Sequence, residues 1–220
     1  MSADCLAGPG EPLGQHLLDV ACCVKQEGEA VALKIARSFG LRPEEARDLL
    51  FYMALMHDAG KADVKYSDDS GYYPIHEAKS VAVIYRTLRE LGLVESCAPS
   101  DGPFSLLLLG VALHHYSHKS YYNKAEPVSF KKRCNAVEKA LSAWKPESEL
   151  GEKIQQKTLE VLATGVSSDL CFGVLATSLR RAAVSPKTKK ATMAALGILN
   201  RCDISIAKSR RKQTSPPEGG

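Results

Sequence analysis

Apolar residues recur at helical spacing over most of this chain. The first two such segments are 13–24 and 31–39, and Gly40 closes the second. A third helix is expected over 43–58, because a proline suits the first helical turn and the two acidic residues behind it complement the helix dipole. No alternation typical of a strand continues for more than a few residues. The pattern therefore predicts an all-α fold.

Six later segments continue the helical pattern. We expect helices over 76–92, 104–115, 128–143, 146–163, 169–184 and 186–208. Together these elements predict a single helical bundle, with one domain over 13–209. A flexible Gly/Pro-rich leader over 1–12 precedes the domain, and a disordered basic tail rich in Pro and Gly follows over 210–220.

Length and composition agree with one globular domain. The chain has 220 residues, of which 45% are hydrophobic and 25% are charged. Its longest uncharged apolar segment, 104–113, is too short to cross a membrane. The first residues also lack the basic and apolar pattern of a secretory signal. We therefore expect a cytoplasmic protein with no membrane partner.

Cysteine spacing and charge are less specific. The seven cysteines form no C-x-x-C pair, so the sequence offers no zinc ribbon or disulfide framework, and buried thiols are the simplest interpretation. The net charge is only +4, but basic residues cluster at 131–133, 187–190 and 208–212. Such clusters suit a polyanionic partner, although charge runs more often form solvated helix faces.

The histidines indicate a metal site. All six lie at or before His118, and the dipeptide His57-Asp58 falls at a predicted helix end, just before Gly60 and Lys61. Imidazole and carboxylate together suit transition metals that activate water for hydrolysis. A carboxylate can join two ions, which makes Asp58 the natural bridge.

Taken singly, the other candidates have simpler interpretations. His16 alone could be a satisfied core residue of an amphipathic helix. The pair His114-His115 could reach one metal only where its helix ends, because neighbouring side chains on a helix diverge by about 100°. Asp203 could be a buried acid paired with an arginine, and His118 is most simply a surface residue.

The order of these residues resembles the HD superfamily of metal-dependent phosphohydrolases. With a single histidine and a His-His pair between the HD dipeptide and the last aspartate, it is most similar to the HD nuclease of CRISPR type I interference, an antiviral system, in the form of a stand-alone subunit. The residues that carry the resemblance are His16, His57, Asp58, Gly60, Lys61, His76, His114, His115 and Asp203.

The resemblance implies two divalent metal ions, which could be Mn, Ni, Co, Fe or Mg. Asp58 and Lys61 are the implied catalytic residues, because Asp58 bridges the ions and Lys61 contacts the substrate phosphate. Each ion would have its own ligand set. The implied sets are His16, His57, Asp58 and Asp203 for one ion, and Asp58, His76, His114 and His115 for the other.

The function implied is a metal-dependent phosphodiesterase that cleaves single-stranded DNA. Its implied partners are a separate helicase subunit and an RNA-guided surveillance complex, and the sequence indeed contains no G-x-x-x-x-G-K-[ST] phosphate loop of its own. The aromatic and basic segment 116–133 could bind a strand by stacking and phosphate contacts, or could instead form a lid on the core. The alternative is an HD phosphohydrolase acting on a nucleotide or cyclic nucleotide, and a non-enzymatic HD scaffold would have lost its ligands.

Overall fold

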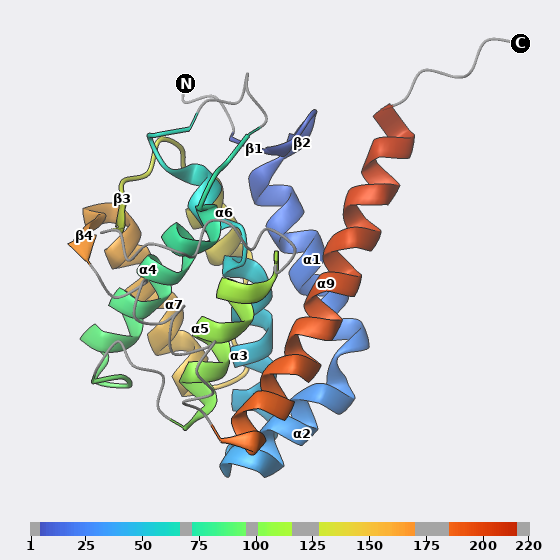
Figure 1. The fold of residues 1–220 in the computed structure, drawn as a ribbon, viewed down its shortest axis with the longest axis vertical. Coiled ribbons are helices and arrows are strands. Elements are labelled where there is room, and N and C mark those ends of the chain that lie inside the picture. The colour runs from blue at the N-terminus through green and yellow to red at the C-terminus, as the bar shows by residue number, and fades with distance from the viewer. Residues whose placement is uncertain (1–4, 67–71, 96–100, 116–127, 170–184, 215–220) are drawn as a thin grey trace, which may run out of the picture.

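The computed structural model describes residues 5–66, 72–95, 101–115, 128–169 and 185–214. Within these residues the chain forms eight α-helices, one short 3₁₀ helix and two small sheets, which confirms the all-α prediction (Figure 1). The helices are α1 (Leu13–Glu27), α2 (Glu29–Phe39), α3 (Pro43–Met56), η1 (Ala59–Ala62), α4 (His76–Glu90), α5 (Pro103–Leu113), α6 (Ala136–Ala143), α7 (Glu149–Thr164) and α9 (Pro186–Thr214). The strands are β1 (Leu6–Gly8), β2 (Glu11–Pro12), β3 (Val128–Phe130) and β4 (Val166–Asp169).

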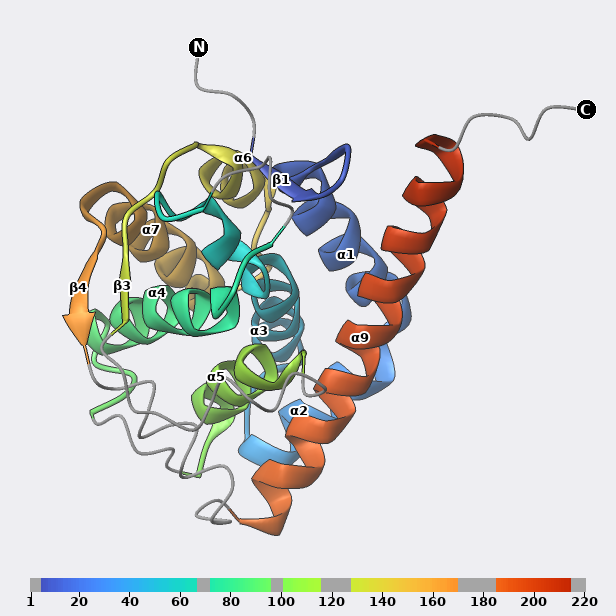
Figure 2. The same cartoon turned by 45° about the horizontal axis from the view of Figure 1, so that its top comes forward.

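Helix α3 forms the centre of the bundle. It packs against α1, α2, α5 and α7, and every residue from Asp48 to Met56 is buried (Figure 2). A helix that is covered on all sides belongs to a core, which explains why its sequence is apolar around most of its circumference. The residues that follow its last turn, His57 and Asp58, are therefore delivered into the interior.

Helix α9 lies along the outside of the bundle, beside α1, α2 and α5 (Figures 1 and 2). The sequence predicted its start at Pro186 correctly, but the helix continues to Thr214 instead of ending near 208. Residues 210–214 are thus helical, and the prediction of a disordered tail is wrong for them. Their Arg, Lys and Gln residues are good helix formers, and that preference outweighs the Pro/Gly composition further on.

The predicted flexible leader is ordered from residue 5 onward. Strands β1 and β2 pair antiparallel across a turn in which Gly10 has a positive φ of 70°. The amide of Leu13 donates to the carbonyl of Cys5 at 2.7 Å, which joins this hairpin to the start of α1. Strands of two or three residues leave no periodic signal in a sequence, so pairing of this kind could not be predicted.

A second departure follows the fifth helix. The predicted helix over 128–143 begins as strand β3, which pairs antiparallel with β4, and becomes helical only at Ala136. The helix predicted over 169–184 lies outside the described residues, except that Asp169 ends β4. Residues 116–127, with His118, also lie outside the described part of the chain. In the part that is described, none of the helices is long and apolar enough to cross a membrane.

Among the residues that the structure describes, two disulfides correct the expectation of buried thiols. Cys5 is bonded to Cys134, and Cys23 is bonded to Cys202. The first bond fastens the hairpin close to the start of α6, and the second fastens α1 to α9. The partners are 129 and 179 residues apart in sequence, which is why cysteine spacing alone gave no hint of the pairing.

Asp48 provides a test of the packing between α3 and α7. Its buried carboxylate accepts the amides of Glu147 and Ser148 and the hydroxyl of Ser148, at 3.0, 2.8 and 2.6 Å. We expect Asp48→Ala to lower the free energy of unfolding by about 2 to 3 kcal/mol, because it leaves buried donors without an acceptor. Ser148→Ala removes the side-chain cap of α7 and one hydrogen bond to Asp48 but leaves both amides paired with the carboxylate, so it should cost only about 1 kcal/mol. Urea denaturation measures both, and equal losses would contradict the assigned role of Asp48.

Candidate metal centre

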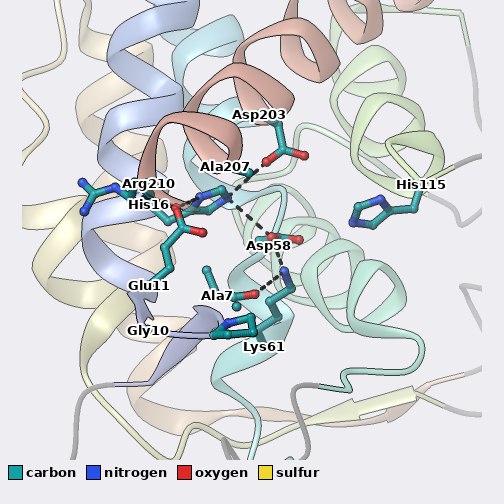
Figure 3. Close-up of a pocket in the computed structure, with 12 residues that line it drawn as sticks. Ala7, Gly10, Glu11, His16, Asp58, Lys61, His115, Asp203, Ala207 and Arg210 are labelled. Atoms are coloured by element: carbon teal, nitrogen blue, oxygen red, sulfur yellow. Dashed lines mark hydrogen bonds and ion pairs between the residues drawn. The ribbon is translucent and has the colours of Figure 1, made fainter. Parts of the chain in front are cut away.

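All seven predicted ligands lie among the described residues, and the ends of several helices bring them together. His57 and Asp58 follow α3, His114 and His115 follow α5, and His76 is the first residue of α4. His16 projects from α1 and Asp203 from α9, so the site lies between helices, as predicted (Figure 3). Helix α5 ends at Leu113, which satisfies the condition that adjacent histidines can converge only beyond a helix end.

Four of the histidines are held through the same ring nitrogen. In each of them Nδ1 contacts an oxygen, so Nδ1 carries the proton in the neutral ring and Nε2 carries a lone pair. For three of them the oxygen is the backbone carbonyl three residues earlier. The contacts are His57 with Ala54 at 2.7 Å, His76 with Tyr73 at 2.6 Å, His114 with Val111 at 2.6 Å, and His16 with the carboxylate of Glu11 at 2.9 Å.

The Nε2 atoms that result all point toward the carboxylate of Asp58. Those of His16, His57 and His76 are buried and have no hydrogen-bond partner. The Nε2 atoms of His76 and His114 lie 2.9 and 3.2 Å from Oδ1 of Asp58. A positive charge between the two atoms, carried by a proton or by a metal ion, satisfies the lone pair and the carboxylate oxygen together. The donor set therefore fits a bound cation.

The two carboxylate oxygens of Asp58 face different groups. Oδ1 faces His76 and His114, with a ring nitrogen of His115 in the same cluster, while Oδ2 lies 3.5 Å from Nε2 of His57 and 3.7 Å from Nε2 of His16. Asp203 completes the second group, since its Oδ1 is 3.3 Å from Nε2 of His16. Donors that each lie about 2.1 Å from one ion are roughly 3 to 3.5 Å apart, and most of these separations are of that size.

Lys61 is part of the same cluster. Its Nζ is 2.6 Å from Oδ2 of Asp58 and donates to the carbonyl of Ala7 at 2.9 Å (Figure 3). The lysine thus connects the carboxylate to the hairpin. The resemblance implies a contact with substrate phosphate, and the ion pair with Asp58 is a further interaction that the sequence did not indicate.

Gly60 is needed for a reason other than ending a helix. Its amide donates to Oγ of Ser80 at 2.8 Å, and a Cβ on this residue would lie only 2.0 Å from the carbonyl oxygen of His76. Only glycine lets the η1 turn approach α4 this closely, and the approach sets Asp58 beside His76. Ile75, the residue just before α4, has a positive φ of 57°. This conformation is costly for a β-branched side chain and is typical of strain held at a functional site.

The electrostatics of the cluster favour added positive charge. Burial opposes ionisation of Asp58, but the Lys61 ammonium and the surrounding imidazoles hold the pKa of this carboxyl well below its usual range. Burial also opposes the charge on His16, yet the carboxylates of Asp203, Glu11 and Asp58 raise its pKa to about 9. His115 differs, because burial and the neighbouring His114 lower its pKa to about 3, so its imidazole is neutral and able to bind a metal.

A cavity of about 140 Å³ opens onto this cluster (Figure 3). The hairpin forms one wall and α9 another. The lining residues are Ala7, Gly8, Pro9, Gly10, Glu11, His16, Asp58, Lys61, His115, Asp203, Ala207 and Arg210. Glu11 and Arg210 were not predicted, since one falls in the supposed leader and the other in the supposed tail.

Comparison with known proteins agrees with this geometry. Residues 6–80 match the family model described as Cas3, HD domain. This segment, about a third of the chain, is therefore similar to the HD nuclease domain of the Cas3 type. No curated protein matches the chain. The matched segment contains the HD dipeptide together with His16, Lys61 and His76.

The Cas3-type HD domain defines the class of chemistry. The match indicates a metal-dependent phosphodiesterase of the HD family, a nuclease of the CRISPR-associated Cas3 type. Domains of this type bind divalent metals, and the His/Asp groups around Asp58 could hold them.

A substitution at Asp58 tests whether this residue organises metal binding. Asp58→Asn keeps the shape of the side chain but removes the charge that faces both groups of histidines, so we expect loss of bound metal while the helical content is kept. Elemental analysis after loading with Mn²⁺ and gel filtration, together with circular dichroism, measures both properties. Glu90→Gln, a charge removal at the surface end of α4, should retain the wild-type metal content. Retention of two ions by Asp58→Asn would overturn the bridging role.

Proposed function

We propose that this chain is a two-metal nuclease that cuts single-stranded DNA as the nuclease subunit of a CRISPR type I interference system. The observation that supports it best is that the two oxygens of Asp58 face two groups of imidazole Nε2 atoms, and that those of His16, His57 and His76 have no hydrogen-bond partner. A single shared carboxylate with imidazoles on both sides is the donor pattern that a pair of adjacent ions requires.

Under this proposal each ion has four protein ligands. One set is His16, His57, Asp58 and Asp203, and the other is Asp58, His76, His114 and His115. Bound ions would supply Lewis acidity toward the phosphoryl oxygens and lower the pKa of a nearby water. A set so rich in imidazole favours Mn, Fe, Co or Ni over Mg, which prefers oxygen ligands.

Lys61 is the residue we assign to the substrate phosphate. Its ammonium lies on the cavity wall, next to Asp58, and its side chain is only 12% exposed. A cation in such a partly desolvated position stabilises negative charge more strongly than one in bulk water. Lys61 is therefore placed to neutralise a phosphoryl oxygen as charge develops there.

The size of the cavity favours a polymer over a free nucleotide. At about 140 Å³ it is well below the ~300 to 1,000 Å³ of pockets that enclose small molecules. It has room for a phosphate group, whereas the sugars and bases on either side would lie outside it. A DNA strand can use further contacts along the surface, which a single nucleotide cannot reach.

One such surface lies next to the site. The segment 131–133 runs antiparallel to 62–64, since the carbonyl of Lys131 accepts from Val64 and the amide of Arg133 donates to the carbonyl of Ala62, both at 2.8 Å. Lys131 is exposed, whereas Lys132 pairs with Glu138. Among the residues of the expected strand-binding segment that the structure describes, Lys131 is thus the side chain best placed to meet a strand.

The remaining parts of the proposal concern partners. The 220 residues contain no phosphate loop of the G-x-x-x-x-G-K-[ST] type, so duplex unwinding must come from outside them. We assign that step to a separate helicase and the choice of target to an RNA-guided complex.

The choice between polymer and nucleotide is tested directly by a substrate panel. The purified protein with Mn²⁺ should cut labelled single-stranded DNA much faster than duplex DNA, and it should leave dNTPs and cyclic nucleotides intact. EDTA should abolish cleavage, and Asp58→Asn should be inactive in a parallel preparation. Turnover of nucleotides without cleavage of single-stranded DNA would replace this proposal by the nucleotide-hydrolase alternative.

Lys61 gives a second test, because a protonated ammonium cannot bind a metal but can stabilise a phosphate. We expect Lys61→Ala to lower the turnover of single-stranded DNA by roughly 10²- to 10³-fold, as for loss of one charge-stabilising donor, with the Mn²⁺ content largely kept. Lys61→Arg should recover part of the rate. A loss of metal that parallels the loss of activity would mean that Lys61 acts mainly by holding Asp58.

A further inference from the structure

His16 differs from the other three oriented histidines in how its ring is held. His57 and His114 follow the last turn of a helix, where backbone carbonyls lack their usual partners and are free to accept from a ring nitrogen. His16 is instead the fourth residue of α1, where carbonyls are engaged in the hydrogen bonds of the helix. Its Nδ1 partner must therefore come from elsewhere, and it is the carboxylate of Glu11 at 2.9 Å.

Glu11 is itself fixed in place. It lies on β2, with its side chain only 11% exposed, and the hairpin that carries it is fastened by the Cys5–Cys134 disulfide. Lys61 adds a hydrogen bond to the carbonyl of Ala7 on β1. A carboxylate on so constrained a segment can hold a neighbouring ring in one orientation.

Arg210 provides the charge that balances this carboxylate. Its Nε is 3.8 Å from Oε1 of Glu11, and its guanidinium also pairs with Asp19 on α1. Arg210 is two helical turns beyond Asp203 on α9, so it lies on the same face of that helix. The contacts thus run from α9 through Arg210 and Glu11 to the ring of His16, while Asp203 approaches the other side of that ring at 3.3 Å (Figure 3).

We propose that Glu11 is a positioning residue that fixes the ring of His16 for the ion shared by His16, His57 and Asp203. The inference rests on the two-metal function proposed above. A carboxylate behind a metal-bound histidine raises the basicity of the ligand as well as orienting it, and loss of such a partner weakens metal affinity by roughly 10- to 100-fold. The His16 side of the centre therefore depends on the hairpin, whereas His76 and His114 depend on carbonyls of their own segments.

Titration of the metal-free protein with Mn²⁺ tests this, with calorimetry for the affinities and electron paramagnetic resonance for coupling between the two ions. Glu11→Ala should lower the affinity for one of the two Mn²⁺ ions by roughly 10- to 100-fold and the affinity for the other by less than about threefold. At limiting Mn²⁺ the signal of a coupled pair should give way to that of an isolated ion. Glu11→Gln, whose amide oxygen still accepts from Nδ1, should recover part of the lost affinity.

Asp19→Asn is the matched control. Asp19 also pairs with Arg210, but it does not contact His16, so this variant should bind both ions as the wild type does. If Glu11→Ala binds both ions with wild-type affinity, or loses affinity for both equally, the role of Glu11 is wrong. Either result would leave the two-metal function unaffected. Uptake of a single ion by the wild-type protein would instead reject the two-metal function, and the effect of Glu11→Ala on that ion would still decide whether Glu11 acts through His16.

Discussion

The structure depends on one buried carboxylate. Asp58 is 2% exposed and is faced by the ammonium of Lys61 and by imidazole lone pairs on both of its oxygens. A buried anion is costly unless it is paired, and one lysine cannot satisfy two oxygens that point in different directions. The histidine rings increase the need for positive charge beside Asp58, because their Nδ1 contacts direct the Nε2 lone pairs toward its carboxylate. Cations bound in the centre would satisfy both oxygens and the ring nitrogens together, and five helices supply the residues that surround this point.

The candidate ligands were implied by the resemblance, and most of them stand where the local sequence pattern predicts a helix end. His57 and Asp58 end an apolar helix, His76 begins one, and the need for a helix end before His114 and His115 is met at Leu113. Glu11 escaped prediction because β1 and β2 are too short to leave a periodic pattern, and its role depends on a hairpin that forms only against α1. The same holds for the disulfides and for the strand at Val128–Phe130, which are decided by partners distant in sequence.

Some of the histidine rings are oriented by local contacts and others by contacts distant in sequence. His57, His76 and His114 each use a carbonyl three residues away, so their orientation follows once the helix end has formed. Gly60 then lets the turn after α3 approach α4, which brings Asp58 to His76. The other side depends on tertiary packing, because α9 must be held against α1 before Asp203 can approach His16. The bond between Cys23 and Cys202 lies next to Asp203 in sequence and fastens these two helices to each other.

The family match stops before the centre is complete. Residues 6–80 include Asp58 and a histidine that faces each of its carboxylate oxygens. His76 faces Oδ1, whereas His16 and His57 face Oδ2. The later ligands His114, His115 and Asp203 come from α5 and α9, which pack on α3 and α1. Without these helices the Nε2 atoms would face water and hydrate individually, and the demand for a cation would disappear. Metal binding by the HD dipeptide therefore depends on the whole bundle, since burial by the later helices makes the unsatisfied lone pairs costly.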